Sequence, residues 1–376
     1  MKVLKITLFV PLSLRRFLNK LVQRRLVFLI MVLLLIVEQI LWNFSSSPPR
    51  QKTNITFMNE NLCNSSATEN TNGRTAVIVV LSARNHFDNR NLIRQTYGTV
   101  RNANNVQILG VVFMLGNLDA HGSDVTDDNK LQEERNRFGD IVVGDFVDCY
   151  RNLTLKTIMA YEWITSRCRE AQIVVKTDDD VFVNIFELTR ELDSWSQDQV
   201  ASSKIWCKVD KEEKSIDDVN SVYYASPLDF PNGFFPTHCE GVGYVTPIGV
   251  IDRIINEIWK SFPRRVCTHE DVFMTGIVPL HINSHSNYFW RKSQLIEHIV
   301  KNSWRSLSLQ DGRGDEDYFL RHFIKNTSMD LEVENFIKLR KRYDKKMFFL
   351  ITHSDHFKKV YLRLWEIIRK IETSPE

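Results

Sequence analysis

The sequence predicts an α/β domain built on a mostly parallel sheet, with one long apolar segment ahead of it. Two observations predict the sheet: continuous runs of β-branched residues recur along the chain, and helical patterns lie between them. Strands that alternate with helices are typical of sheets covered by helices. Because such sheets bind ligands at the carboxyl ends of their strands, polar residues that follow a strand are the first functional candidates.

Four apolar runs are expected to form buried strands, and four stretches are expected to form the helices between them. The strand candidates are Thr75–Leu81, Val106–Leu115, Asp140–Val143 and Gln172–Lys176. The helix candidates are Asn89–Tyr97 and three apolar stripes at helical spacing: Leu155, Ile158, Met159 and Trp163; Ile185, Leu188, Leu192 and Trp195; and Ile251, Ile254, Ile255 and Ile258. Asn152 or Thr154 is placed to cap the second helix.

The apolar segment, residues 26–44, is 19 residues long and carries one charge, Glu38. A helix of that length spans about 28 Å, enough for the hydrocarbon core of a bilayer. Basic residues gather before it and are sparse after it, which predicts a cytosolic N-terminus and a lumenal location for most of the chain. A cleaved signal peptide is the alternative, although the run is long for one and no small-residue cleavage pattern follows Trp42.

Four parts follow from this pattern: a cytoplasmic tail at 1–25, a transmembrane signal-anchor at 26–44, a polar stem at 45–74 and a lumenal domain at 75–376. The stem has no periodicity and few large apolar residues. Hydrophobic residues make up 43% of the 376-residue chain, enough for a full core. The formal charge of +3 is too small to imply a nucleic-acid partner.

All six cysteines follow the apolar segment, and an oxidising lumen predicts that some of them pair. Six cysteines allow about 15 connectivities, and the sequence does not choose among them. No CxxC pair is present, so a zinc site is not expected. Glycosylation is expected at the sequons of Asn54, Asn64 and Asn326. The sequon at Asn152 coincides with a predicted helix start; if that start is buried, Asn152 is a cap and carries no glycan.

The strongest local signal is the segment Val175–Asn184, in which a buried strand runs directly into Asp178, Asp179 and Asp180. Three adjacent carboxylates repel each other, so a partner must hold them together. Mn²⁺ or Mg²⁺ would do so, because each binds one or two carboxylates together with phosphate oxygens. A solvated acidic turn is the alternative.

Two further segments carry candidate residues. Glu270 and Asp271 precede an apolar stretch, where a carboxylate could cap a helix or act as a general base. Gly241 and Gly243 follow Glu240, and two glycines one residue apart let the backbone approach a ligand closely. A β-turn or a bulge explains the glycines equally well.

Five segments together resemble glycosyltransferase family 31, the β-1,3-galactosyltransferase and β-1,3-N-acetylglucosaminyltransferase family. They occur in the family's order between about residues 76 and 276. Arg90–Gly98 is similar to the family's RxxIRxTW motif, with Tyr97 in place of Trp. The other four segments, each followed here by the family motif that it resembles, are Asp145–Thr157 (DFxDxYxNLTxKT), Val175–Asn184 (KxDDDxFVN), Glu240–Val245 (GxGYV) and Glu270–Gly276 (EDVxxG).

The resemblance implies a GT-A fold, in which a Rossmann-like nucleotide-binding half and an acceptor-binding half share one domain. It also implies a UDP-sugar donor, Mn²⁺ with Mg²⁺ possible, and an inverting transfer that forms a β-1,3 linkage. In that picture Asp180 ligates the metal and Asp178 binds ribose or a metal-bound water. Asp271 takes the proton from the acceptor hydroxyl. The segment Phe349–His353 is similar to a family strand that supplies a metal-binding histidine, which would be His353.

The resemblance assigns the remaining site residues by position. The donor site would use Asp178 and Asp179, with Arg94 and Lys156 supporting it directly or by fixing nearby carboxylates. Glu240, Gly241, Gly243 and Glu270 would form the loop around the donor sugar and acceptor. The protein would be a single-pass type II Golgi membrane enzyme acting on a glycan of a glycoprotein or glycolipid.

Several alternatives remain open at this level. Galactose is the expected sugar, with N-acetylglucosamine from UDP-GlcNAc as the alternative. A non-catalytic lumenal glycan-binding protein and a metal-dependent phosphate-ester hydrolase are alternatives from other classes, although no second group of metal ligands stands near Asp178. Residues 284–346 match no family segment, so acceptor identity stays open.

Overall fold

The protein is described by a computed structural model that covers residues 32–33, 52–59, 63, 73–117, 125–200, 204–211, 213–263, 266–285, 349–351 and 357–373. The chain divides into two compact units, Met1–Arg50 and Gln51–Glu376, and all named strands and helices belong to the second. Among the residues just given, no helix is both long enough and apolar enough to cross a membrane. The predicted anchor at 26–44, apart from residues 32–33, and most of the stem lie outside them.

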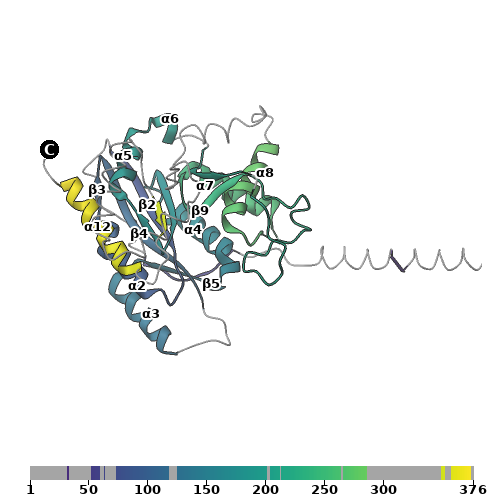
Figure 1. Ribbon diagram of the computed structural model, residues 1–376, viewed down its shortest axis with the longest axis horizontal. Coiled ribbons are helices and arrows are strands. Elements are labelled where there is room, and N and C mark those ends of the chain that lie inside the picture. Colours follow the sequence, from purple (N-terminus) through teal and green to yellow (C-terminus); the bar gives the residue numbers. More distant parts are fainter. Residues whose placement is uncertain are drawn as a thin grey trace, which may run out of the picture. The chain divides into compact units, whose positions relative to one another are not determined.

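An eight-stranded sheet forms the centre of the second unit (Figure 1). Its strands run in the order β1-β5-β4-β2-β6-β9-β8, and β3 pairs with β4. Their bounds are β1 Ile55–Phe57, β2 Arg74–Leu81, β3 Asn102–Ala103, β4 Val106–Asn117, β5 Ile141–Val147, β6 Ile173–Asp178, β8 Trp206–Asp210 and β9 His238–Pro247. A second, two-stranded sheet joins β7 Val181–Val183 to β10 Phe349–Ile351.

The sheet is mixed, with a parallel centre and antiparallel edges. Strands β5, β4, β2 and β6 are parallel to one another and correspond to the four predicted strands, which are confirmed. Strands β1, β9 and β8 pair antiparallel, so the prediction of a mostly parallel sheet is right only for the centre. These antiparallel strands are either short or less apolar than the central ones. Their pairing is decided by contacts between residues that are far apart in the sequence.

Helices follow the strands as the periodicity predicts. The α-helices are α2 Phe87–Gln95, α3 Val125–Phe138, α4 Leu153–Arg167, α5 Ile185–Ser194, α6 Gln197–Val200, α7 Ile248–Ser261, α8 Val278–His285 and α12 Phe357–Thr373. The shorter turns are η1 Tyr97–Thr99, η2 Tyr150–Asn152 and the π-helix η3 Val272–Ile277. All four predicted helices are confirmed as α2, α4, α5 and α7.

The core has two halves, one on each face of the sheet. Ile78 and Val80 of β2 pack in the half that contains residues of α2, α5 and α12. Val77 and Val79 alternate with them and pack in the half that contains residues of α4 and α7. Because neighbouring strand residues point to opposite faces and both faces are covered, β2 is apolar at nearly every position.

Helix α12 is one of the elements that were not predicted from the sequence, together with α3, α8 and the edge strands β1, β8 and β9. It lies beside α2 and is drawn in yellow in Figure 1. Its Tyr361 is fully buried, donates a 3.3 Å hydrogen bond to the carbonyl of Val181, and packs against the ring of Phe182. The spacing of Tyr361, Leu364, Trp365 and Ile368 was the signal that could have predicted it.

Two disulfides pair four of the six cysteines. Cys63 pairs with Cys168 at the end of α4, and Cys207 of β8 pairs with Cys239 of β9. Cys149 and Cys267 belong to neither disulfide. The predicted cap of α4 is wrong in detail: Asn152 occupies the cap position without a side-chain cap bond, and its amide donates to the carbonyl of Val147 at 2.8 Å.

Candidate active site

Asp178 is the last residue of β6, so it stands at the carboxyl end of the parallel strands. Its register partner on β2 is Leu81, the last residue of that strand. The Asp178 side chain is 36% exposed, and its Oδ1 accepts a 2.9 Å hydrogen bond from Nζ of Lys176. The acid run therefore begins where an α/β sheet offers a ligand site.

Lys176 is a buried cation that joins three segments. Its Nζ donates to the carbonyl of Gly241 at 2.7 Å and lies 3.2 Å from Oε2 of Glu270, in addition to its bond to Asp178. The ring of Tyr244 lies 5.4 Å from the same atom. Burial alone would lower the pKa of Lys176, but Asp178 and Glu270 raise it above its ordinary value. Lys176 is therefore charged at neutral pH.

Glu270 and Asp271 stand at the start of η3. Glu270 is buried and accepts a 2.5 Å hydrogen bond from the hydroxyl of Tyr244. Asp271 occupies the cap position of η3, and its Oδ1 accepts from the backbone N–H of Val272 at 2.8 Å. A Cβ atom on Gly241 would lie 3.1 Å from Oδ2 of Asp271, so this carboxylate packs against the β9 backbone. The capping interpretation is confirmed for Oδ1, and Oδ2 faces the β9 backbone at Gly241.

The two glycines lie within β9, where they form a bulge. The pairing of β8 with β9 moves from Cys207 opposite Tyr244 to Val209 opposite Cys239, so Glu240–Gly243 face the single residue Lys208. On the other side of β9, Gly243 stays in register with Thr177 of β6. The bulge brings the Gly241 carbonyl to Lys176. Glu240 forms an ion pair with Lys208.

Negative charge exceeds positive charge at the end of β6. The pKa of Asp178 is raised to about 7, first by burial and then by Glu270 and Asp180, against the opposing effect of Lys176. A bound cation would favour the ionised form of such a carboxyl. Oxygen-only donors from two nearby carboxylates, Asp178 and the half-buried Asp180, fit Mn²⁺ or Mg²⁺.

Asp179 is turned away from its two neighbours and ties the acidic turn to the segment after β2. Its carboxylate accepts hydrogen bonds from Ser82 Oγ at 2.6 Å, from His86 Nδ1 at 2.9 Å and from Asn89 Nδ2 at 3.3 Å. Burial would raise the pKa of Asp179, but these donors, His86 above all, lower it below its ordinary value. The structure shows a positioning role for Asp179, and donor binding by it stays a prediction.

Lys156 and Arg94 both hold carboxylates. Lys156 of α4 is buried, and its Nζ donates to Asp148 Oδ1 and to the carbonyl of Ser82, each at 2.7 Å. Arg94 of α2 donates to both oxygens of Asp140 at 2.7 Å and to Glu134 at 2.6 Å. Of the two alternatives for these cations, the observed contacts fit the fixing of carboxylates. Lys156 does so beside Ser82, which in turn contacts Asp179.

His353 lies outside the described residues, as do Asn64 and Asn326. Ile351, two residues before His353, pairs with Val181, the residue that follows Asp180. Asn54 is exposed, and its side-chain amide donates to Asp145 Oδ2 at 2.9 Å.

No role was predicted from the sequence for three residues that help to build this site. Lys176 stood in a quoted motif, but a buried lysine cannot be recognised without knowing what surrounds it. Tyr150 and Tyr223 form an exposed edge-to-face pair with ring centroids 5.3 Å apart. Partial burial raises the pKa of Tyr150, and Tyr223 and the charges of Asp271 and Asp178 raise it further.

A family model described as "Galactosyltransferase" matches residues 88–286, more than half of the chain. Beta-1,3-galactosyltransferase 1 of Mus musculus is 32% identical over 198 residues, covering 53% of this chain and 58% of that protein. Beta-1,3-galactosyltransferase 5 of Homo sapiens is 34% identical over 199 residues, covering 53% and 60%. The chain thus spans about three fifths of the length of these relatives.

Among solved structures, a galactosyltransferase in complex with donor and acceptor sugar analogs aligns at 12% identity and a TM-score of 0.31, covering 80% of this chain and 98% of that one. The family match, residues 88–286, contains all five segments from Arg90 to Gly276 on which the resemblance was founded. This chain therefore belongs to the galactosyltransferase family.

Proposed function

We propose that this chain is an inverting hexosyltransferase that transfers galactose from a UDP-sugar to a hydroxyl group of a glycan, forming a β-1,3 linkage. Family membership and the names of the relatives support the reaction class. One structural observation carries the proposal: buried Lys176 contacts both Asp178, at the end of β6, and Glu270, beside Asp271 at the start of η3. A donor-side carboxylate and a candidate base thereby face one site.

The chemistry divides between these two sides. Oδ2 of Asp271 accepts the proton of the acceptor hydroxyl while the hydroxyl oxygen attacks the anomeric carbon. The new C–O bond forms as the bond from that carbon to the diphosphate breaks, and UDP leaves with the electron pair. Because Oδ1 is held by the N–H of Val272, the Asp271 carboxylate is oriented before the acceptor arrives.

Asp178 and Asp180, with His353 as a further ligand, would hold Mn²⁺ or Mg²⁺ at the diphosphate. When bound, that ion neutralises charge on the leaving diphosphate. The carboxylate excess around Asp178 supports this assignment. We also assign the GT-A fold to the chain, on the strength of its parallel centre and of the acid run at the end of β6.

A type II topology in the Golgi membrane, with the catalytic domain in the lumen, completes the proposal. The apolar segment at 26–44 with basic residues before it supports an anchor of that orientation. The disulfides Cys63–Cys168 and Cys207–Cys239 support an oxidising compartment, because such bonds are rare in the cytosol.

The test is a transfer assay with the purified full chain, Mn²⁺, and UDP-galactose or UDP-N-acetylglucosamine, offered with a panel of glycan acceptors and followed by mass spectrometry. We expect a mass gain of one hexose with UDP-galactose, linked β-1,3. The Asp271→Asn variant should bind UDP as the wild type does, yet lose at least about 100-fold in kcat, because only the base is removed.

Preferential transfer from UDP-N-acetylglucosamine would replace the donor and keep the reaction. UDP binding with no transfer to any acceptor would overturn the proposal in favour of a glycan-binding protein. Full activity in Asp271→Asn would overturn the assignment of the base. Asp252→Asn on α7 is the matched control, since it removes one carboxylate outside the site.

A further inference from the structure

A second cluster of metal-ligating side chains lies where β8 ends and β9 begins, apart from the acid run. Asp210 is the last residue of β8 and is in register with His238, the first residue of β9. Glu213 follows in the next loop, and its carbonyl accepts a 2.9 Å hydrogen bond from the N–H of Phe235. One ligand atom from each of Asp210, Glu213 and His238 lies within 4.8 Å of the others.

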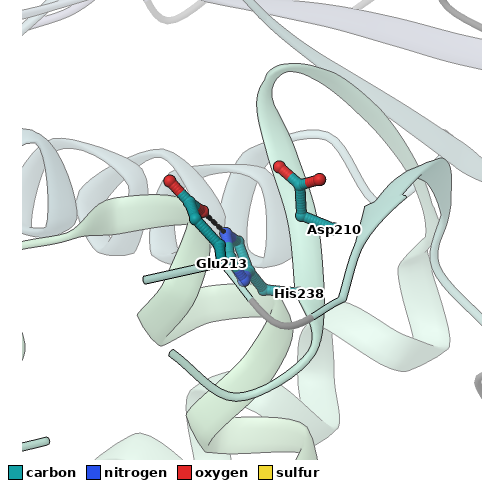
Figure 2. A group of neighbouring side chains, drawn as sticks. All are labelled: Asp210, Glu213 and His238. Carbon is teal, nitrogen blue, oxygen red and sulfur yellow. Dashed lines mark ion pairs between the residues drawn. The ribbon is translucent and has the colours of Figure 1, made fainter. Parts of the chain in front are cut away.

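His238 is held in the orientation of a metal ligand. Its side chain is 2% exposed, and its Nδ1 lies 2.8 Å from the carbonyl of Pro236, which can only accept a hydrogen bond. Nδ1 therefore carries the proton, and Nε2 is directed at Glu213 Oε2, 3.0 Å away. Metal-binding histidines usually donate their second ring nitrogen to a carbonyl or carboxylate in this way. Figure 2 shows Asp210 beside the His238–Glu213 pair.

Charge also favours a cation at this position. With a neutral imidazole, the cluster holds two carboxylates and one lone pair facing each other, and no proton lies between Nε2 and Oε2. An imidazolium ion would satisfy Glu213 but would leave Asp210 without a matching charge from this cluster. A divalent ion balances both carboxylates and uses the Nε2 lone pair, with water as a fourth ligand.

We propose that Asp210, Glu213 and His238 form a zinc site separate from the donor-metal site. One imidazole nitrogen and two carboxylate oxygens are ligands that Zn²⁺ accepts, and imidazole suits Zn²⁺ better than it suits Mn²⁺ or Mg²⁺. Tetrahedral ligands at zinc distances lie roughly 3.3 Å apart, close to the 3.0 Å already seen between Nε2 and Oε2. Asp210 is half-buried, and its ligand atom lies within 4.8 Å of the other two, so rotation of its side chain would close the remaining gap.

The proposed ion would fasten both ends of the long loop that connects β8 to β9. That loop holds Tyr223, which packs against Tyr150, and β9 continues from His238 to Gly241, where a Cβ atom would lie 3.1 Å from Oδ2 of Asp271. The Cys207–Cys239 disulfide ties the same two strands at adjacent positions. Zinc would therefore stabilise the segment that carries one wall of the site.

The test uses the purified full chain, freed of metal with a chelator and kept without nucleotide. Zn²⁺ is titrated in competition with a chromogenic zinc indicator, and the melting temperature is measured with and without one equivalent. We expect one tight zinc equivalent and a higher Tm in the wild type. Asp210→Asn and Glu213→Gln should each weaken binding by about tenfold or more and lose the Tm rise.

Two controls separate this site from others. Cys267→Ser removes a thiol 3.8 Å from His269 Nδ1, a pair with zinc-binding atoms outside the proposed site, and should keep the tight equivalent. Asp180→Asn alters the donor-metal site and should also keep it, so failure of the proposed transferase activity would not affect this result. Equal binding by the wild type and Glu213→Gln, no binding by the wild type, or loss only in Cys267→Ser would each overturn the proposal.

Discussion

Nζ of Lys176 lies 3.2 Å from Oε2 of Glu270, and this contact joins the central sheet to the start of η3. Both side chains are almost completely buried, so neither charge can be satisfied by bulk water. The same ammonium group binds Asp178 and the Gly241 carbonyl, so the candidate metal ligand, the β9 bulge and the acidic helix start are held at one point. Lys176 therefore links three parts of the site.

Removal of the Lys176 charge should lower the free energy of unfolding. Lys176→Met leaves Glu270 buried without its partner, and breaking a buried pair in this way costs about 3–5 kcal/mol. Urea denaturation of the two proteins measures the loss. Lys176→Met/Glu270→Gln should recover part of it, because the second change removes the unpaired charge. A loss below about 1 kcal/mol in Lys176→Met would show that Lys176 is not the organising residue.

Gly241 should be required for activity more than for folding. A Cβ atom there would lie 3.1 Å from Oδ2 of Asp271, so Gly241→Ala should displace the carboxylate while costing less than about 1 kcal/mol of stability. We expect kcat to fall at least about tenfold. Gly249→Ala is the control: its Cβ enters open space in α7, and alanine should stabilise that helix slightly. Equal activity in both variants would contradict the proposed position of the base.

The His86–Asp179 pair should make stability depend on pH. The hydrogen bond to Asp179 raises the pKa of His86, and burial opposes this effect. The contribution of His86 to stability is therefore complete below about pH 6.5 and is lost as pH rises through the raised pKa. Burial alone would raise the pKa of Asp179, but the hydrogen bonds from His86 and other donors lower it. The contribution of Asp179 to stability is therefore present above about pH 4 and is lost as pH falls through the lowered pKa. The pair is strongest between these limits.

Thermal unfolding at pH 6 and pH 9 tests this expectation. His86→Gln should lower Tm more at pH 6 than at pH 9, because the histidine is charged only at the lower pH. In an Asp179→Asn background the same change should show no such pH dependence, since its partner charge is gone. A Tm difference that is equal at both pH values would contradict the assignment.

The Cys63–Cys168 bond should stabilise the domain, because it links a segment before β2 to the end of α4. Its sequence separation is 105 residues, and a loop of that length corresponds to about 4–5 kcal/mol in the chain-entropy account. Cys63→Ala/Cys168→Ala should lower the free energy of unfolding by about 2–5 kcal/mol in denaturant titrations. Cys149→Ser, which alters an exposed free thiol, should change it by less than about 0.5 kcal/mol.

The sequons should differ in occupancy. Thr154 is buried and its hydroxyl donates to the carbonyl of Cys267 at 2.7 Å, so the Asn152 sequon is inaccessible in the folded chain. We expect Asn152 to be unmodified and Asn54, which is exposed, to carry a glycan. Peptide mapping before and after glycan removal measures both. A glycan on Asn152 would mean that modification precedes the docking of α4.

Local patterns sufficed for the centre of the fold and for the residues that carry charge. The strands β2, β4, β5 and β6 were predictable, because burial on both faces makes them continuously apolar. The acid run Asp178–Asp180 was predictable as a ligand site because it follows such a strand. The motif resemblance added the family, which the comparison with the family model confirms.

By itself, the sequence determined which residues are acidic, which segments are buried and which family they belong to, because those properties reside in residue type and spacing. The tertiary structure alone decided which acids face each other. It separated Asp179 from its neighbours by surrounding it with Ser82 and His86, and it joined Asp178 to Glu270 through Lys176. The physical reason is that a buried charge is tolerated only beside its partner, and strand pairing, which links distant segments, selects that partner.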